Sequence, residues 1–450
     1  MSNNFELARS FFYQGEENYS KKNYKDAEKN FLLSLNLLPN RISTLVNLGL
    51  TQIKLNKIKE VSEVIEKIEL LLDNKHDEED KKNLLNLKSI FYGETNNFSK
   101  SIEVLNQLII HPKIENYKIS EYYSYMGIAY SKLENYKKNI ELQKKSIEIN
   151  PDNIFAKFNL GLQYLKFEDY KKGWFLYEYR LQKNKLSKKH YPENIIQIKN
   201  KKILIKSEQG FGDIIQFSRF ISLLESYTSK IDFLVPKQIG NLLKYKKANI
   251  IFKKKESYDY EIYLCSIPFL LNIDYSDLNN ITYSNFKYQK NKHKYDFEKN
   301  KKFNVGLAWS GRESYSYDYL RSLKLDSLSP LLKNPKIKFF CLQKDIREID
   351  KKKFLSSNIS YWGDLNFEDL AKKMIELDFV ISSDTSILHL SSSLKIKTLA
   401  MLPFVSDWRW PMFKNNSNWY KDLKIFRQKK GETWENVVEE INGLINKNEI

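Results

Sequence analysis

The stretch that decides the fold runs from Leu377 to Trp410 and reads LDFVISSDTSILHLSSSLKIKTLAMLPFVSDWRW. The apolar run 379–381 is typical of a buried strand, and four small polar residues, 382–385, follow it directly. A helical pattern comes next, and a second apolar strand, 398–402, ends at Pro403. This order of strand, polar turn, helix and strand predicts a unit of a parallel α/β sheet.

The start of the predicted helix permits two interpretations. Ser383, Asp384, Thr385 and Ser386 lie where a helix N-terminus offers free backbone N–H groups and a partial positive charge, which suits a phosphate. The alternative is that Asp384 and Thr385 only cap the helix. His389 lies one turn after Thr385 on the same face, so it either faces a ligand or packs there. The residues alone leave both interpretations open.

Length and composition limit the class of protein. The chain has 450 residues, 42% of them hydrophobic, which is too long for one core and sufficient for two or three domains without disulfides. Its two cysteines lie in apolar strand-like runs, and no cysteine or histidine cluster suggests a metal site. The sequence shows no signal peptide and no apolar stretch near the ~20 residues that span a bilayer. We therefore expect a cytoplasmic protein.

The formal net charge of +18 raises the question of nucleic-acid binding. The basic residues are mostly lysines spread along the whole chain among Asn, Ile and Tyr, which is typical of solvated faces. We do not expect a nucleic-acid partner, because that hypothesis rests on net charge alone. An anionic acceptor, or peripheral contact with an anionic membrane surface, fits the charge better.

The first 187 residues contain an internal repeat. An aromatic or apolar residue opens a helical pattern at spacings of 34, 40, 38 and 34 residues. A period near 34 is that of tetratricopeptide helix pairs, and several units resemble the tetratricopeptide consensus. Glycines nine residues upstream in three units indicate close packing of the two helices. We predict about five repeats that stack into an α-solenoid and offer a surface to a protein partner. The repeat positions are Tyr24, Ile58, Phe98, Tyr136 and Tyr170, and the glycines are Gly49, Gly127 and Gly161.

Short apolar strands alternate with helical patterns after residue 191, and a polar stretch at 288–302 divides them into two sets. Alternating strands and helices predict two Rossmann-like halves, 191–290 and 300–450, with ligands at the carboxyl ends of the strands. We expect the last helix to pack back on the first half. The predicted strands are 202–206, 230–235, 249–252, 261–264, 305–309, 338–342, 379–381, 398–402 and 424–426.

A glycine-rich turn follows the first of these strands. Gly210 and Gly212 permit a tight turn into a helix and the close approach of a ligand, although the third glycine of the dinucleotide fingerprint is missing. Asp213 with Gln216 fits a capping box. The functional alternative is that Asp213 is a general base for an acceptor hydroxyl.

The ordered set of motifs resembles a known family. The chain is similar to bacterial tetratricopeptide-linked glycosyltransferases, which are related to the heptosyltransferases of glycosyltransferase family 9. The matches lie within residues 202–428, and the repeats add the expected N-terminal module. The segments that carry the resemblance are 208–219 (EQGFGDIIQFSR), 305–311 (VGLAWSG), 321–323 (RSL), 342–344 (LQK), 382–386 (SSDTS), 389–390 (HL) and 402–410 (LPFVSDWRW).

This resemblance implies a GT-B fold, with two Rossmann-like halves and the nucleotide sugar held mainly by the C-terminal one. It implies metal-independent transfer, usually with inversion, and Asp213 as the catalytic base. Without a metal, the leaving diphosphate must be stabilised by a helix N-terminus, hydroxyls and cations. Trp408 and Trp410 either form a lid over the donor or pack in the core. The residues expected to bind donor or substrate are Gln209, Gly210, Gly212, Arg321, Gln343, Lys344, Ser383, Asp384, Thr385, Ser386, His389, Trp408 and Arg409.

The sequence therefore favours a glycosyltransferase that moves a hexosyl or heptosyl group from a nucleotide sugar. Its repeats would recruit a glycan, lipid-linked or protein acceptor, and no cofactor is expected. The alternative is a catalytically inactive scaffold of the same architecture that serves protein–protein interaction.

Overall fold

The computed structural model describes residues 2–72, 77–112, 114–188, 190–290, 302–315 and 318–450. The contacts within the chain define two compact units, Met1–Leu160 and Gly161–Ile450. The boundary falls inside helix α9, so the second helix of the last predicted repeat belongs to the second unit and not to a domain ending at residue 187. Most of the predicted polar linker 288–302 lies outside the described residues.

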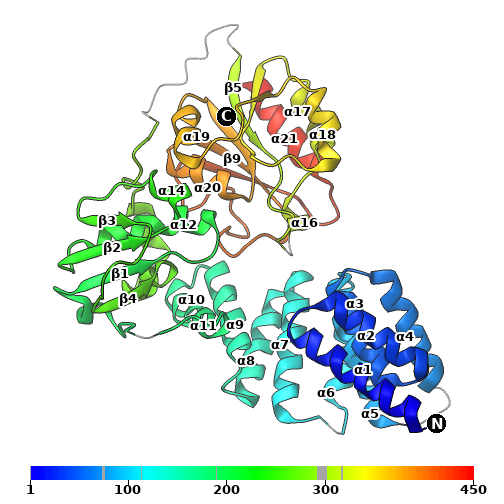
Figure 1. Ribbon diagram of the computed structural model, residues 1–450. Coiled ribbons are helices and arrows are strands. Elements are labelled where there is room, and N and C mark those ends of the chain that lie inside the picture. The colour runs from blue at the N-terminus through cyan, green and yellow to red at the C-terminus, as the bar shows by residue number, and fades with distance from the viewer. Residues whose placement is uncertain (1, 73–76, 113, 189, 291–301, 316–317) are drawn as a thin grey trace. The chain divides into compact units, whose positions relative to one another are not determined.

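The repeat region consists of helical hairpins (Figure 1). Successive helices of a pair contact one another along their length, and the apolar side chains of the first unit, such as Phe31, Leu45, Ile68 and Leu87, are buried between them. The helices are α1 (Ser2–Ser20), α2 (Tyr24–Leu37), α3 (Ile42–Lys54), α4 (Ile58–Leu72), α5 (Glu78–Glu94), α6 (Phe98–Ile109), α7 (Asn116–Lys132), α8 (Tyr136–Ile149), α9 (Ile154–Lys166) and α10 (Tyr170–Tyr177), followed by the short α11 (Tyr179–Lys183).

The predicted repeat positions are confirmed, because each of the five residues is the first of the second helix in its pair. In every pair the chain reverses through the same turn, with a left-handed residue two positions before that helix. These residues have φ between 59° and 67°, a conformation that makes a tight connection between helices. They are Lys22, Asn56, Asn96, Glu134 and Glu168.

Two of the three predicted glycines lie where the helices of a pair meet. A Cβ atom on Gly127 would lie 2.6 Å from Nε2 of Gln143 in α8, and one on Gly161 would lie 2.9 Å from the backbone of Leu176 in α10. Gly49 instead lies closest to the next pair, because a Cβ atom there would lie 2.9 Å from Cδ2 of Leu87 in α5 and 3.4 Å from Cγ1 of Val64 in its partner helix α4. The described part of the first unit is therefore a solenoid of tetratricopeptide-like helix pairs.

A four-stranded parallel sheet of order β3-β2-β1-β4 follows in the second unit. The central residues of β1 and β2 are buried, and in β1 they form an unbroken apolar run in the sequence. The strands are β1 (Lys202–Lys206), β2 (Lys230–Leu234), β3 (Ala248–Ile251) and β4 (Tyr260–Tyr263), and the helices between and after them include α12 (Phe211–Phe217), α13 (Ile221–Leu224), α14 (Lys237–Gly240) and α15 (Ile267–Leu270).

The second sheet has six parallel strands in the order β10-β9-β8-β5-β6-β7. Counted from β5 as the first strand, this is the doubly wound order of Rossmann-like sheets, whose direction of winding reverses between β5 and β8. The strands are β5 (Phe303–Ala308), β6 (Ile337–Cys341), β7 (Ser360–Tyr361), β8 (Phe379–Ser383), β9 (Lys397–Leu402) and β10 (Leu423–Arg427), with α16 (Asp318–Arg321), α17 (Ser329–Leu332), α18 (Glu348–Leu355), α19 (Phe367–Met374), α20 (Ser386–Ser393) and α21 (Trp434–Lys447).

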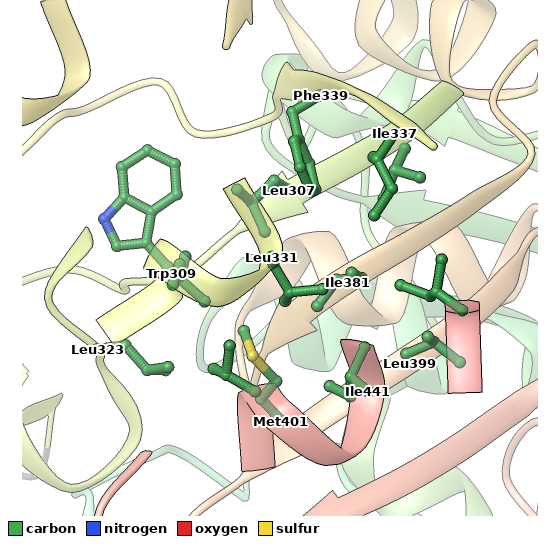
Figure 2. Close-up of a cluster of buried hydrophobic side chains, with 14 of the residues drawn as sticks. Leu307, Trp309, Leu323, Leu331, Ile337, Phe339, Ile381, Leu399, Met401 and Ile441 are labelled. Atoms are coloured by element: carbon green, nitrogen blue, oxygen red, sulfur yellow. The ribbon is translucent and has the colours of Figure 1, made fainter. Parts of the chain in front are cut away.

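From the sequence we expected the last helix to pack back on the first half. It packs on the second sheet instead. Its apolar stripe, Val437, Val438, Ile441 and Ile445, is part of the core of the second sheet. Figure 2 shows Ile441 among Leu331, Ile381, Leu399 and Met401, which come from α17 and from strands β8 and β9. The stripe packs on the apolar face of the second sheet near β9 and β10, so α21 covers the sheet of its own half.

The net charge is not spread evenly, which corrects the view from composition. Residues 1–160 hold 23 basic and 22 acidic residues, whereas residues 161–450 hold 51 and 34. The α/β part therefore carries nearly the whole positive excess.

Within the described residues, no helix combines the length and apolar character needed to cross a bilayer.

We predict that Ile441→Ala lowers the free energy of unfolding of the second unit by about 2–5 kcal/mol, because it deletes a fully buried side chain. All seven tryptophans lie in the second unit, so urea unfolding followed by tryptophan fluorescence reports on that unit alone. Glu440→Ala, at an exposed position of the same helix, is the control and should change the value by less than about 0.5 kcal/mol. Equal midpoints for the two variants would contradict the placement of α21.

Candidate functional site

The N-terminus of α20 begins directly where β8 ends, beside the switch point of the second sheet. Thr385 is the N-cap residue, but its side chain makes no capping hydrogen bond and lies 3.4 Å from the Ser382 hydroxyl instead. The hydroxyl of Ser383 is buried without a hydrogen-bond partner among the residues that the structure describes. Side-chain capping by Thr385 is therefore not observed, and the first turn keeps its donors for another acceptor.

Arg321 brings a cation to this helix start. Its Nη1 donates to the backbone carbonyl of Asp384 at 2.7 Å, and its Nε donates to Asp318 at 3.1 Å. The guanidinium carbon lies 4.7 Å from the ring centre of Tyr315. Arg347 holds Asp318 from the other side and donates to the Ser322 hydroxyl at 2.9 Å. The sequence indicated Arg321, but it gave no signal for Asp318, Tyr315 or Arg347.

Asp213 lies in the first turn of α12, at the end of β1. Its Oδ2 accepts a hydrogen bond from the backbone N–H of Gly210 at 3.0 Å, so Gly210 is the N-cap and Asp213 the third helical residue. The predicted box of Asp213 with Gln216 is therefore wrong, because the helix starts three residues earlier. Gln209 has a left-handed backbone with φ 60°, and its side chain donates to the Tyr177 hydroxyl at 2.7 Å.

The other carboxylate oxygen of Asp213 forms an ion pair with Nη2 of Arg409. Arg409 also donates from Nε to Gln216 at 2.7 Å and from Nη1 to Asp407 at 2.8 Å. All three nitrogens of this buried guanidinium thus bind protein oxygens. Arg409 joins α12 of the first sheet to the loop after β9 of the second. Sequence reasoning placed Arg409 at the site but missed Asp407 and the part played by Gln216.

The starts of α12 and α20 lie against each other. A Cβ atom on Gly212 would lie 2.9 Å from Cδ2 of His389 and 3.7 Å from Cα of Ser386, so a larger residue would press against α20. The two turns that the sequence picked out separately, with Asp213 and Thr385 172 residues apart, therefore form one site. The close approach explains Gly212 better than a tight turn does.

His389 is held in a polar and aromatic setting. Its Nδ1 lies 2.8 Å from the Tyr420 hydroxyl, its ring stacks on Trp410 with centroids 5.6 Å apart, and its Nε2 lies 3.9 Å from Oδ1 of Asp384. Burial, helped by the nearby positive charge of Arg409, lowers the pKa of His389 to about 3. The imidazole is therefore uncharged at neutral pH.

The two carboxyl groups of the site are shifted in the opposite direction. Burial and the neighbouring Asp407 carboxylate raise the pKa of Asp384 to about 6, although Arg321 and Arg409 partly offset the shift. Burial also raises the pKa of Asp213, against the effect of Arg409. Shifts of this kind cluster at functional sites, because such sites remove charges from water without neutralising them fully.

Three predicted site residues have other contacts. Gln343 is buried, accepts from the backbone N–H groups of Trp309 and Ser310, and donates to the Ser310 hydroxyl at 2.9 Å, so it holds the turn after β5. Lys344 is exposed and pairs with Asp364 at 2.9 Å. Trp408 is buried among the rings of Tyr170, Trp174, Tyr177 and Trp419, an arrangement that favours core packing over a lid.

A cavity of about 490 Å³ opens beside the Asp318 ion pairs. Arg347 and Ser322, which both bind Asp318, form part of its wall, so the cavity adjoins the network that holds Arg321. Among the described residues, no group of three or more His, Cys, Asp or Glu side chains is arranged to hold a metal ion. The cavity is lined by Glu313, Tyr319, Ser322, Leu323, Lys324, Arg347, Glu348 and Ile349.

No protein-family profile and no curated protein matches the sequence. Similar solved structures include MamA, at 19% identity and a TM-score of 0.30 over 40% of this chain and 93% of that one. PilF of Pseudomonas aeruginosa has 14% identity and a TM-score of 0.34 over 40% and 78%. A putative kinesin light chain of Podosopora anserina with TPR-like repeats has 13% identity and a TM-score of 0.35, over 42% of this chain and 100% of that one. The repeat architecture is evident from the chain's own helix pairs.

We predict that Gly212→Ala destabilises the second unit by about 1–3 kcal/mol, because the new methyl group meets the ring of His389, which stacking on Trp410 holds in place. Gly443→Ala is the matched control, since a Cβ there meets nothing within 4 Å. It should stabilise α21 by about 0.5–1 kcal/mol through helix propensity. Urea unfolding that gave both variants the same sign would refute the close approach of the two helices.

We predict that Asp384→Asn stabilises the protein at pH 7.5 by about 1–3 kcal/mol but has little effect near pH 4. The pKa of Asp384 is raised to about 6, so its contribution to stability is fully present below the unfolded pKa of about 3.9 and is lost as the pH rises through 6. An asparagine cannot ionise and escapes this loss. Thermal melts at the two pH values measure the difference, with exposed Asp326→Asn as control. A gain independent of pH would show that charge is not its cause.

Proposed function

We propose that the second unit is a glycosyltransferase of GT-B type that transfers a hexosyl or heptosyl group from a nucleotide sugar, with the donor diphosphate at the N-terminus of α20. One observation carries the proposal. The carboxyl ends of β1 and β8, each next to the switch point of its sheet, meet at the Gly212–His389 contact. Ligands of doubly wound sheets bind at such switch points, so one space would serve an acceptor base and a donor phosphate.

The proposed donor site supplies what a leaving diphosphate needs. When the bond from the anomeric carbon to the diphosphate oxygen breaks, its electron pair leaves with that oxygen, and negative charge grows there. The free N–H groups of α20, the hydroxyls of Ser383 and Thr385, and the guanidinium of Arg321 can all face that charge. Such preorganised donors stabilise a transition state because they need no rearrangement as the charge develops. A resident metal ion is not part of this proposal.

Asp213 is the proposed base. It would take the proton of the acceptor hydroxyl as that oxygen attacks the anomeric carbon from the face opposite the diphosphate, which inverts the configuration. Burial raises its pKa, so the carboxylate is a stronger base than an exposed aspartate. Its ion pair with Arg409 occupies one oxygen and lowers the pKa of Asp213 against the effect of burial, which favours the ionised carboxylate.

The repeats are the proposed acceptor-binding module. Stacked tetratricopeptide-like pairs offer extended surfaces that bind proteins, and exposed aromatic residues such as Tyr117 and Tyr125 of α7 are suited to stacking on a peptide or sugar ring. We propose a glycan, lipid-linked or protein acceptor, with transfer in the cytoplasm, where nucleotide sugars are made. The positive excess of the second unit would favour an anionic acceptor.

A second candidate function is an inactive scaffold of the same architecture. One observation favours it: both carboxylate oxygens of Asp213 already bind protein groups, Gly210 and Arg409. If Asp213 stays in both pairings, it cannot take the proton of an acceptor, and the protein would not catalyse transfer. The two functions differ in whether a nucleotide sugar binds and reacts.

The test is a screen of nucleotide sugars by thermal shift, followed by assay of released nucleoside diphosphate with candidate acceptors. A bound donor raises the melting temperature by mass action. We expect Asp213→Asn to keep donor binding and to lower turnover by about 10²–10⁴-fold, because it removes the base. Arg321→Gln should weaken donor binding at least tenfold, and exposed Asp326→Asn should behave as the unchanged chain does.

Two outcomes would decide against the proposal. If a broad panel of donors gives neither a thermal shift nor turnover, the scaffold hypothesis holds. If a donor binds with the same affinity to the Arg321→Gln protein, the diphosphate does not lie at α20.

A further inference from the structure

Tyr420 is a buried hydroxyl that the proposed function leaves unused. Its oxygen lies 2.8 Å from Nδ1 of His389, and both residues are buried. The turn that carries it is fixed on two sides. The indole N–H of Trp419 donates to the Tyr170 hydroxyl at 2.8 Å, and Arg219 donates to the carbonyl of Trp419 at 2.9 Å. The hydroxyl therefore keeps its place relative to His389.

A neutral imidazole carries its single proton on one of two nitrogens, and the hydrogen bond at one nitrogen determines the state of the other. Either the Tyr420 hydroxyl donates to Nδ1, and the proton is on Nε2, or Nδ1 carries the proton and donates to Tyr420. The distance of 2.8 Å permits both. The groups around Nε2 and around the hydroxyl separate the two cases.

Nε2 points toward an acceptor. Oδ1 of Asp384 lies 3.9 Å from it, and this carboxylate is largely ionised above pH 6. A proton on Nε2 is attracted to that oxygen, whereas a lone pair on Nε2 would face negative charge across a buried gap. The Asp384 side therefore favours the Nε2–H tautomer.

The surroundings of Tyr420 favour the same tautomer. Its ring stacks on Tyr283 at 5.1 Å, and the guanidinium of Arg219 lies 4.6 Å from the centre of the Tyr283 ring. Arginine only donates hydrogen bonds, and its charge favours a hydroxyl whose oxygen is turned toward it and whose hydrogen is turned away. The hydroxyls of Tyr283 and Ser393 also lie beside the Tyr420 hydroxyl, and when they donate to its oxygen, its own hydrogen is left for His389.

We propose that Tyr420 is a positioning residue that donates to Nδ1 of His389 and so fixes the neutral Nε2–H tautomer. His389 then presents an uncharged donor toward Asp384 and the start of α20. A neutral donor suits an oxygen of the transferred sugar, because it stabilises that oxygen without adding a second cation beside Arg321. This use rests on the proposed function, whereas the tautomer itself does not.

The tautomer can be measured without any donor. In the full chain labelled with ¹⁵N-histidine, long-range ¹⁵N–¹H correlation at pH 7.5 distinguishes a protonated from an unprotonated ring nitrogen. Only five histidines are present, and His389→Gln identifies the signal. We expect Nε2 protonated and Nδ1 unprotonated. In Tyr420→Phe, which keeps the stacked ring, we expect a mixture of both tautomers.

Tyr258→Phe is the matched control, because it removes a buried tyrosine hydroxyl that donates to Asp232 and not to His389; its spectrum should not change. A proton on Nδ1 in the unaltered protein overturns the proposal, even if Tyr420→Phe fails to fold. So does a Tyr420→Phe spectrum identical to that of the unaltered protein. If a donor is found, Tyr420→Phe should weaken its binding or turnover by about three- to tenfold. The absence of any donor would refute the proposed function alone.

Discussion

The α/β unit depends on one buried cation, the guanidinium of Arg409. It pairs with Asp213 and donates hydrogen bonds to Asp407 and Gln216, and its carbon lies 4.3 Å from the ring centre of Trp408. Removing one partner from a buried ion pair costs about 3–5 kcal/mol, because the other charge stays uncompensated. The contact between the two sheets is therefore specific. It is satisfied only when α12 and the loop after β9 meet in this arrangement.

Helices α10 and α11 contact the loop between β1 and α12. Arg180 of α11 binds Glu208 at 2.6 Å, the Tyr177 hydroxyl accepts from Gln209, and Trp174 donates to the carbonyl of Ile273 at 3.0 Å. These contacts explain why the second unit begins at Gly161 and not after residue 187. The final repeat helices have become part of the α/β core, so they position the loop that carries Asp213.

The sequence was sufficient where the signal is local. Buried parallel strands appear as apolar runs, and the five repeat turns recur with the same period, so both could be predicted. β7 was missed because two residues at a sheet edge make no run. The predicted packing partner of α21 was wrong, because an apolar stripe shows that a helix packs against something but not which sheet it packs against. Asp318, Arg347 and Tyr420 gave no signal, since their roles come from contacts with residues distant in sequence.

The site can also be argued from where charges are left unsatisfied. Arg180 is buried, and both Glu178 and Glu208 pair with it, as a buried charge with a structural role requires. At the start of α20 the opposite holds. Asp384 has a raised pKa, His389 a lowered one, and the Ser383 hydroxyl is buried without a partner among the described residues. A helix end that needed only a cap would not retain three unfavourable groups. The free energy lost by burying these groups is explained if a ligand pairs with them, because binding sites are stabilised less than the fold around them.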